Sequence, residues 1–165
     1  MRPGELNKEQ WEQLASTKVE AVQLTKFSIV DIERFWPIID WALRQAPPLG
    51  VEDDDAFVVN MQRMLLEGEV DAWGIASVPE LKLVGLMTTR FAESLSGEER
   101  LFVTSLFVYS GLSDAAWMEV VAQLKEYAAV RGVKYIGAFT SNERIAKLAK
   151  DLGADVSWRV ITLEV

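Results

Sequence analysis

Apolar residues recur at helical spacing in four segments of the chain. Side chains three or four positions apart share one face of a helix, so each segment predicts a helix packed on a core. Short polar side chains cap helix starts and glycine favours helix ends. The four helices are expected from the capping pair Ser28 and Asp31 to Pro47, from 52–55 to Gly68, over 113–131, and from Ser141 or Asn142 to Gly153. Pro37 predicts a kink in the first helix, unless that helix starts nearer Glu33.

Six other segments have the alternation or the apolar content of β-strands. Residues 100–108 are apolar at nearly every position, which predicts a strand that is covered on both faces. Short turns separate 70–77, 81–91 and 100–108, so these strands are expected to form an antiparallel meander. The six strands are expected at 18–27, 70–77, 81–91, 100–108, 134–140 and 155–165.

The elements therefore follow the order β-α-α-β-β-β-α-β-α-β. A meander followed by a strand–helix–strand unit predicts an α/β (α+β) protein with a single mixed, mostly antiparallel sheet and helices on both faces. A further short helix is expected over 6–17, where Asn7 can cap its start. We expect two parts, an N-terminal helical arm at 1–17 and one domain at 18–165.

The composition removes several kinds of chemistry. The 165 residues include no cysteine and no histidine. Disulfides, thiolate metal sites and every nucleophile activated by histidine are thereby excluded. Acid–base chemistry would have to use Asp, Glu, Tyr, Lys, a chain terminus or water.

The formal net charge of −8 argues against direct binding of nucleic acid or of an anionic membrane. No apolar run approaches the roughly 18 residues of a membrane-spanning helix, and the first residues do not have the pattern of a signal peptide. We therefore expect a cytoplasmic protein.

Two features could indicate ligands or partners. The acidic run 52–55 could bind a hard cation such as Mg²⁺ or Ca²⁺ through its carboxylate oxygens. Acidic residues before a helix more often interact favourably with the helix dipole, so no metal site is predicted. Six tryptophans are present. Four lie on predicted core stripes, namely Trp36, Trp73, Trp117 and Trp158. Trp11 and Trp41 are candidates for a contact with a protein partner, because aromatic side chains concentrate the binding energy of interfaces.

Residues 134–156, "KYIGAFTSNERIAKLAKDLGADV", resemble the strand–Asn–helix–Gly ending of the GNAT superfamily of acyl-CoA-dependent N-acetyltransferases. The strand and helix at 101–131 match the family in pattern, and the likeness covers about 18–165. The chain is more specifically similar to small GNAT-like proteins of bacteriophage head-gene clusters. The segments that carry this second likeness are "FWPIIDWALRQ", "LLEGEVDAW" and "LKEYAAVRGVKYI".

The resemblance implies where a cofactor would lie. The backbone of Leu106 and Val108 would hold the pantetheine of acetyl-CoA between the fourth and fifth strands, near Asn142. The pyrophosphate would lie at the N-terminus of the helix that starts after Ser113, where free backbone N–H groups attract anions.

The chain departs from the family at this loop. The family places a basic residue and then glycines at alternate positions, and those positions hold Ser113, Asp114, Ala116 and Met118 here. Repulsion between Asp114 and a diphosphate at about 4–6 Å costs on the order of 1 kcal/mol. Side chains also replace glycines where the backbone must approach the ligand closely. The same residues form an ordinary helix start with Ser113 as N-cap, and this interpretation is favoured.

The residue that protonates the leaving thiolate in many members of the family is a tyrosine, and its position holds Ala149 here. Tyr109, at the end of the fourth strand, remains as a candidate acid, whereas Tyr127 is expected to be a packing residue. Glu98 and Glu99 are candidate bases, although carboxylates at such positions more often belong to turns. Thr104 and Ser105 lie on the same strand but cannot act as bases without a partner.

Two hypotheses follow. In the first, the chain is a GNAT-fold protein without acetyltransferase activity and without a cofactor. It would act as a binding or structural component that contacts a protein partner or a second copy, in the bacterial cytoplasm or in a bacteriophage particle. In the second, it is a divergent N-acetyltransferase that moves the acetyl group of acetyl-CoA directly to an amine.

Overall fold

The structure is a computed structural model that describes residues 9, 18–48, 50–140, 142–157 and 163. Residues 155–157, the described start of the strand expected at 155–165, are not in a strand. Apart from residues 9 and 163, the helix expected over 6–17 and the rest of that strand lie outside the described residues and stay predictions, as does the division into two parts. The described elements are β1 (Val22–Lys26), α2 (Ile29–Gln45), α3 (Asp54–Leu66), β2 (Asp71–Ser77), β3 (Leu83–Glu93), β4 (Glu99–Val108), α4 (Asp114–Val130), β5 (Ile136–Ala138) and α5 (Glu143–Asp151).

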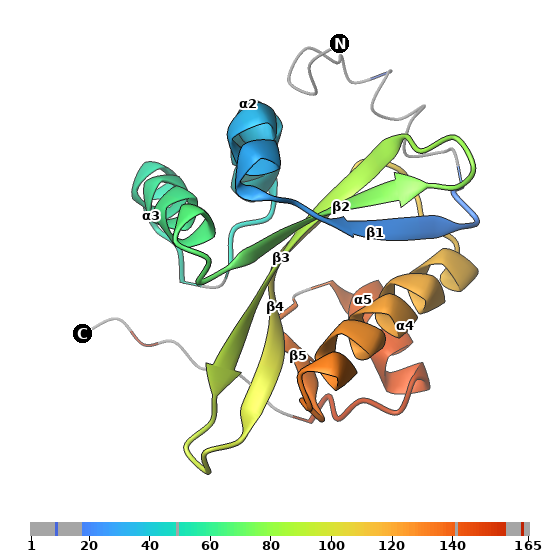
Figure 1. Cartoon of the computed structure of the whole chain (residues 1–165). Helices are drawn as coiled ribbons and strands as arrows, with labels where there is room; N and C mark the ends of the chain where they lie inside the picture. The colour runs from blue at the N-terminus through green and yellow to red at the C-terminus, as the bar shows by residue number, and fades with distance from the viewer. Residues whose placement is uncertain (1–8, 10–17, 49, 141, 158–162, 164–165) are drawn as a thin grey trace.

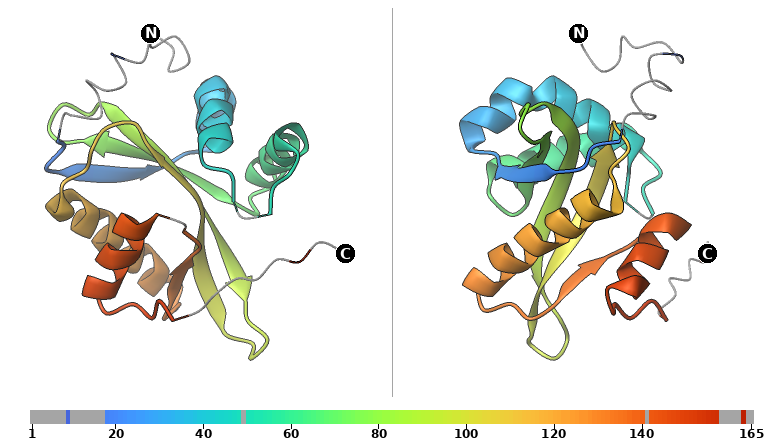
Figure 2. Two further views of the ribbon diagram at one scale, coloured as in Figure 1. Left: turned by 180° about the vertical axis from the view of Figure 1, so that it is seen from behind. Right: turned by 90° about the vertical axis from the view of Figure 1, so that its right-hand side faces the viewer.

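The described strands form one mixed sheet in the order β1-β2-β3-β4-β5. Neighbouring strands from β1 to β4 are antiparallel, and β4 and β5 are parallel. Helices α2 and α3 lie on one face of the sheet, and α4 and α5 lie on the other (Figures 1 and 2). The α+β class, the meander and the helices on both faces are confirmed.

Local capping starts the helices where the sequence places the caps. Ser28 and Asp31 form a reciprocal capping box at the start of α2. Asp53 caps α3, and Ser113 caps α4 by accepting a hydrogen bond from the backbone N–H of Ala116. Helix α2 begins at Ile29 and not near Glu33, so Pro37 lies inside it.

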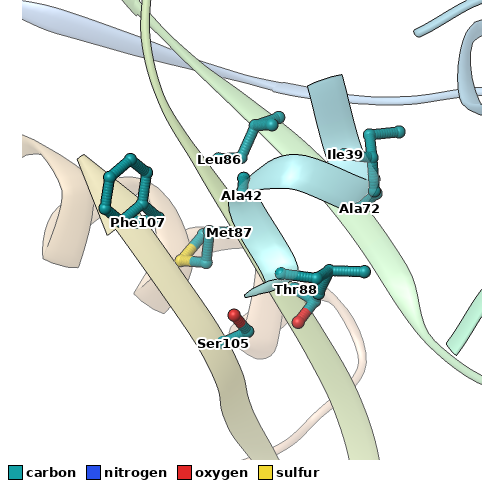
Figure 3. Close-up of a pocket in the computed structure, with 9 residues that line it drawn as sticks. Ile39, Ala42, Ala72, Leu86, Met87, Thr88, Ser105 and Phe107 are labelled. Atoms are coloured by element: carbon teal, nitrogen blue, oxygen red, sulfur yellow. The ribbon is translucent and has the colours of Figure 1, made fainter. Parts of the chain in front are cut away.

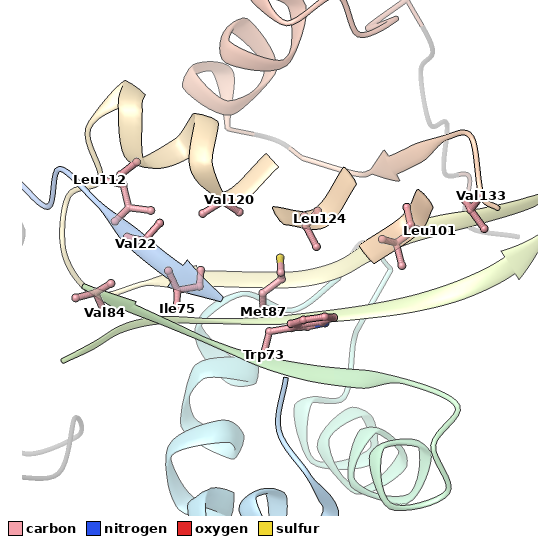
Figure 4. Packing of buried hydrophobic residues seen from close by; sticks show 12 residues of the cluster. Val22, Trp73, Ile75, Val84, Met87, Leu101, Leu112, Val120, Leu124 and Val133 are labelled. Atoms are coloured by element: carbon pink, nitrogen blue, oxygen red, sulfur yellow. The ribbon is translucent and has the colours of Figure 1, made fainter. Parts of the chain in front are cut away.

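Two hydrophobic clusters cover the two faces of the sheet. One lies between the sheet and α4 and includes Trp73, Met87 and Leu124 (Figure 4). The other packs α2 and α3 on the opposite face and includes Ile39 and Leu65. Side chains of β4 belong to both clusters, so the prediction that this strand is covered on both faces is confirmed.

The aromatic residues on the predicted core stripes are half-buried or buried where they are described. Trp73 is 7% exposed, and Trp36 and Trp117 pack against the two clusters. Trp158 lies outside the described residues. Trp41 packs edge-on against Phe107 of β4, with ring centroids 5.1 Å apart, so much of its ring surface is used within the fold.

Candidate functional site

Strands β4 and β5 pair over only three residues and then separate. The pairs are Leu101–Ile136, Phe102–Gly137 and Val103–Ala138. On its other side β4 stays paired with β3 as far as Val108. Within the described part of the chain, the edge of β4 that faces β5 therefore has no strand partner beyond Val103.

A β-bulge at Thr104 accompanies this separation. Thr88 pairs with Ser105 and Thr89 pairs with Val103, so Thr104 is an extra residue on β4. A bulge bends the strand and reverses which side chains face each side. Leu101 and Val103 pack in the α4 cluster before the bulge, and Leu106 and Val108 do so after it. The odd-numbered Phe107 and Tyr109 then face α2.

The backbone at the β4–α4 junction is bonded to the segment that precedes β1. The N–H of Val19 donates to the carbonyl oxygen of Gly111 at 2.8 Å, and the N–H of Ser113 donates to the carbonyl oxygen of Val19 at 2.9 Å. The Ser113 hydroxyl accepts from the N–H of Ala116 at 3.1 Å. Two of the N–H groups at the start of α4 are thus used within the protein, and Ser113 acts as the predicted cap.

A cation from α5 lies at the same junction. The guanidinium of Arg144 donates to the carbonyl oxygen of Leu112 at 3.1 Å and lies 3.6 Å from the carboxylate of Asp114. Both side chains are solvent-exposed, 59% for Arg144 and 80% for Asp114, so the pair contributes little to stability. Asn142, a candidate cofactor ligand, caps α5 by accepting from the N–H groups of Arg144 and Ile145.

Arg144 is the residue that the sequence analysis missed. The resemblance places the basic position on the loop before α4, where Ser113 stands. Strands β4 and β5 are parallel, so the helices that follow them both begin at the same end of the sheet. The predicted strand–helix–strand order therefore already indicated that a cation in the first turn of α5 would reach the start of α4.

Tyr109, the candidate acid, faces the α2 side of the sheet. Its ring lies 5.9 Å from that of Trp41 and 5.7 Å from that of Phe107. Its hydroxyl is buried and has no hydrogen-bond partner among the described residues. Burial raises the pKa of this phenol well above its usual value, so it is protonated at neutral pH.

Glu98 and Glu99, the candidate bases, lie at the opposite end of β4. Strand β4 has ten residues, which corresponds to a length of about 30 Å. The Glu99 carboxylate accepts two hydrogen bonds from the guanidinium of Arg131, at 2.8 and 3.0 Å. The two glutamates line a hollow of about 180 Å³ at that end of the sheet. The structure therefore does not bring them together with Tyr109 or with the start of α4.

Thr104 and Ser105 are held by neighbouring groups. Thr104 shares a hydrogen bond of 2.8 Å with the hydroxyl of Thr88, and Ser105 donates to the carbonyl oxygen of Ala46 at 2.8 Å. Ser105 lines a cavity of about 10 Å³ beneath α2 (Figure 3). A space of that size holds one water molecule at most. Neither hydroxyl contacts a basic group in these bonds.

The acidic run before α3 is used in the helix start. Asp53 caps the helix, and Asp55 accepts from Arg44 at 2.7 Å. Among the residues that the structure describes, no group of three or more acids is arranged to hold a metal ion. No helix in that same part of the chain is long and apolar enough to cross a membrane.

Solved structures identify the fold. A probable acetyltransferase has a TM-score of 0.62 at 14% identity and covers 87% of this chain and 97% of its own. A ribosomal-protein-alanine N-acetyltransferase from Brucella melitensis biovar Abortus 2308 has a TM-score of 0.58 at 18% identity, covering 88% and 99%. A predicted acetyltransferase from Clostridium acetobutylicum, solved with acetyl-CoA, has a TM-score of 0.57 at 12% identity, covering 86% and 96%.

The chain has the GNAT fold. No protein-family model and no curated protein matches the sequence. At these identities the likeness concerns the fold alone, because one fold supports many activities. In the GNAT fold seen here, the opening between β4 and β5 and the start of α4 form the candidate site.

Proposed function

We propose that the chain is a GNAT-fold protein that does not transfer acetyl groups and acts by binding a protein partner. The observation that carries this proposal is the pair of hydrogen bonds between Val19 and the β4–α4 junction. The bond to Gly111 fixes its carbonyl oxygen, and the bond from Ser113 uses the backbone N–H of that residue within the fold. A diphosphate at a helix start depends on such backbone N–H groups.

The side chain of Asp114 acts in the same direction. Asp114 stands at the first position of α4, where its carboxylate would repel a diphosphate and already has Arg144 beside it. Ala116 is fully buried in the cluster between α4 and the sheet, so its methyl group is a packing group of the core.

A thermal-shift titration with acetyl-CoA tests the proposal. A ligand at 100 times its dissociation constant stabilises the folded state by about 2.7 kcal/mol, which raises Tm by roughly 5–10 °C for a domain of this size. We expect no shift at millimolar acetyl-CoA for the wild type. Asp114→Arg removes the repulsion and adds a cation. We therefore expect acetyl-CoA to raise the Tm of this variant more than that of the wild type. A saturable shift in the wild type would overturn the proposal.

The partner that we propose is a component of a bacteriophage particle, or a second copy of the chain within one. The similarity of three segments to phage-encoded GNAT-like proteins supports this location, and the protein would otherwise stay in the bacterial cytoplasm. Mass spectrometry of purified particles of the virus that encodes the chain should detect it at a fixed stoichiometry. A strictly monomeric protein that is absent from those particles would contradict this part.

A divergent acetyl-CoA-dependent N-acetyltransferase is the second candidate, and the bulge at Thr104 with the opening after Val103 favours it. The free edge of β4 at Leu106 and Val108 could bond the pantetheine, and Arg144 could replace the missing cation. The amine nitrogen would attack the thioester carbon, the carbon–sulfur bond would break, and the amine proton would pass to water as CoA leaves.

This second candidate has a sensitive assay, because the chain has no cysteine. A thiol reagent added to the protein, acetyl-CoA and a set of amines therefore reports released CoA without background from the protein. If the chain is an enzyme, Arg144→Ala should raise KM for acetyl-CoA, whereas Lys150→Ala at the other end of α5 should not. Release no faster than in the absence of protein, for every amine, excludes this candidate.

A further inference from the structure

We infer that Glu119 and Gln123 of α4 close the free edge of the sheet and prevent β1 from pairing with β1 of another copy. Among the described strands, β1 is the first in the sheet order and pairs with β2 on one side only. An edge strand presents unpaired N–H and C=O groups, which are a template for another strand.

Three hydrogen bonds between α4 and β1 use backbone groups on the free edge of β1. The N–H of Val22 donates to the Glu119 carboxylate at 2.7 Å. The N–H of Leu24 donates to the side-chain oxygen of Gln123 at 2.8 Å, and the side-chain nitrogen of Gln123 donates to the carbonyl oxygen of Val22 at 3.1 Å. The Gln123 amide thus accepts and donates as the peptide group of a neighbouring strand would.

The spacing of the two side chains suits this role. Four residues of an α-helix rise by about 6 Å, and two residues of a strand by about 6.7 Å. Glu119 and Gln123 are four residues apart, and the N–H groups that they accept from, on Val22 and Leu24, are two residues apart. A second bond from Gln123, to the carbonyl oxygen of Glu119 at 3.3 Å, holds its side chain on this face of the helix.

The closure continues beyond the N-terminal end of β1. Val19 pairs with Leu112 as an isolated parallel bridge, and its N–H and C=O are bonded to Gly111 and Ser113. Five backbone groups between Val19 and Leu24 are therefore bonded to the segment 111–123. Lys26, at the far end of the strand, adds a charge of the kind that discourages edge pairing.

A second copy of β1 is the strand that this arrangement excludes. Its sequence, VQLTK, contains the β-branched residues Val and Thr, which suit an extended backbone. Two identical edges can pair about a two-fold axis, because each then offers the other the same groups. Without Glu119 and Gln123, the groups of Val22 and Leu24 would be available for that pairing.

The test compares the double variant Glu119→Ala/Gln123→Ala with the control Lys125→Ala/Glu126→Ala, which changes two exposed residues of the same helix. At low concentration, hydrogen exchange at the N–H groups of Val22 and Leu24 should be at least tenfold faster in the double variant alone. At higher concentration, sedimentation velocity should show an additional association that the wild type and the control lack. A folded double variant with fast exchange at both groups that sediments like the wild type at all concentrations would overturn the inference.

A single variant covers the case in which the double variant does not fold. Gln123→Glu keeps an acceptor for Leu24 and loses the donor to Val22. The probe is a fluorescein-labelled peptide of residues 20–27, EAVQLTKF, followed by fluorescence anisotropy. We expect it to bind Gln123→Glu at least tenfold more tightly than the wild type. Equal binding to both proteins, or binding to neither, would contradict the inference that Gln123 closes the edge.

Discussion

Thr89 is fully buried in the middle of β3, beside the bulge in β4. Its hydroxyl accepts a hydrogen bond of 2.9 Å from the indole N–H of Trp73. Both residues lie on the face of the sheet that packs against α4, where water cannot replace a lost partner. A buried donor without a partner keeps its full desolvation cost.

Thr89→Val should therefore destabilise the protein by about 1–3 kcal/mol, because it leaves the Trp73 N–H unpaired at nearly unchanged volume. Urea unfolding monitored by tryptophan fluorescence would measure the loss. Thr25→Val, at an exposed position of β1, is the matched control and should change stability by less than about 0.5 kcal/mol. Equal effects of the two variants would contradict a specific role of the hydrogen bond.

The side chains at the start of α4 illustrate what can be predicted for a single residue. The capping role of Ser113 follows from its neighbours in the chain, and the structure has that cap. The contact between Asp114 and Arg144 joins two helices and is not visible in either segment alone. Local bonds can thus be predicted from the sequence, whereas a contact between elements requires their arrangement in space.

Two glycines on neighbouring strands allow close approaches in the sheet. A methyl group on Gly85 of β3 would lie 2.9 Å from the backbone oxygen of Phe107 in β4. A methyl group on Gly74 of β2 would lie 2.8 Å from the ring of Phe27, which is half-buried at the end of β1. The first contact is with backbone held in the β3–β4 ladder, and the second is with a side chain that can rotate.

Gly85→Ala is consequently expected to cost about 1–3 kcal/mol of unfolding free energy, the range for an overpacked interior. Gly74→Ala should cost clearly less, because the Phe27 ring can move away. Chemical denaturation of both variants gives the comparison. The account of β3 and β4 as a tight pair would be wrong if Gly74→Ala were the more damaging change.

Helix α4 combines three roles in one element. Its apolar stripe packs on the sheet, its first turn meets Arg144, and its middle turns bond the edge of β1. The periodicity of 113–131 predicts the stripe and the length of the helix. It gives no reason to separate Glu119 and Gln123 from other polar residues on the helix, because their partners belong to a distant strand.

A small polar network links three elements of the molecule away from the candidate site. Lys26 of β1 lies 2.8 Å from the carboxylate of Asp71 in β2, and Tyr127 of α4 donates to that carboxylate at 2.6 Å. Burial alone would lower the pKa of Lys26, but the hydrogen bond and the charge of Asp71 outweigh it, so the pKa is raised. Burial and the bond to Asp71 raise the pKa of Tyr127.

These shifts predict how stability depends on alkaline pH. A group whose pKa is higher in the folded than in the unfolded protein stabilises the folded state. For Lys26 and Tyr127 the unfolded pKa is about 10, and the full stabilisation is present below that pH. The stabilisation is lost as pH rises through the folded pKa. The free energy of unfolding should therefore fall as pH rises above about 10. Measured by urea unfolding between pH 8 and pH 11, this fall should be shallower in Asp71→Asn, which removes the shared partner.

The matched control for that series is Asp55→Asn. Its carboxylate also takes part in an ion pair, with Arg44, but it is 86% exposed. The control should keep the alkaline slope of the wild type. A slope that is the same in all three proteins would show that the network does not govern stability at high pH.

The sequence by itself determined the helix starts, most of the strands, their order and the α+β class. Caps, glycine ends and alternating apolar residues act within a few positions, so their effect can be predicted along the chain. The resemblance to the GNAT superfamily also implied where a cofactor would lie, along β4 and at the start of α4.

Only the tertiary structure decided what surrounds that place. The bulge at Thr104, the short pairing of β4 with β5 and the contact of Arg144 with Asp114 depend on how elements pack. Val22 and Glu119 are separated by 97 residues along the chain. Contacts over such separations form only once the sheet and its helices are assembled, since no local pattern specifies which distant groups will meet.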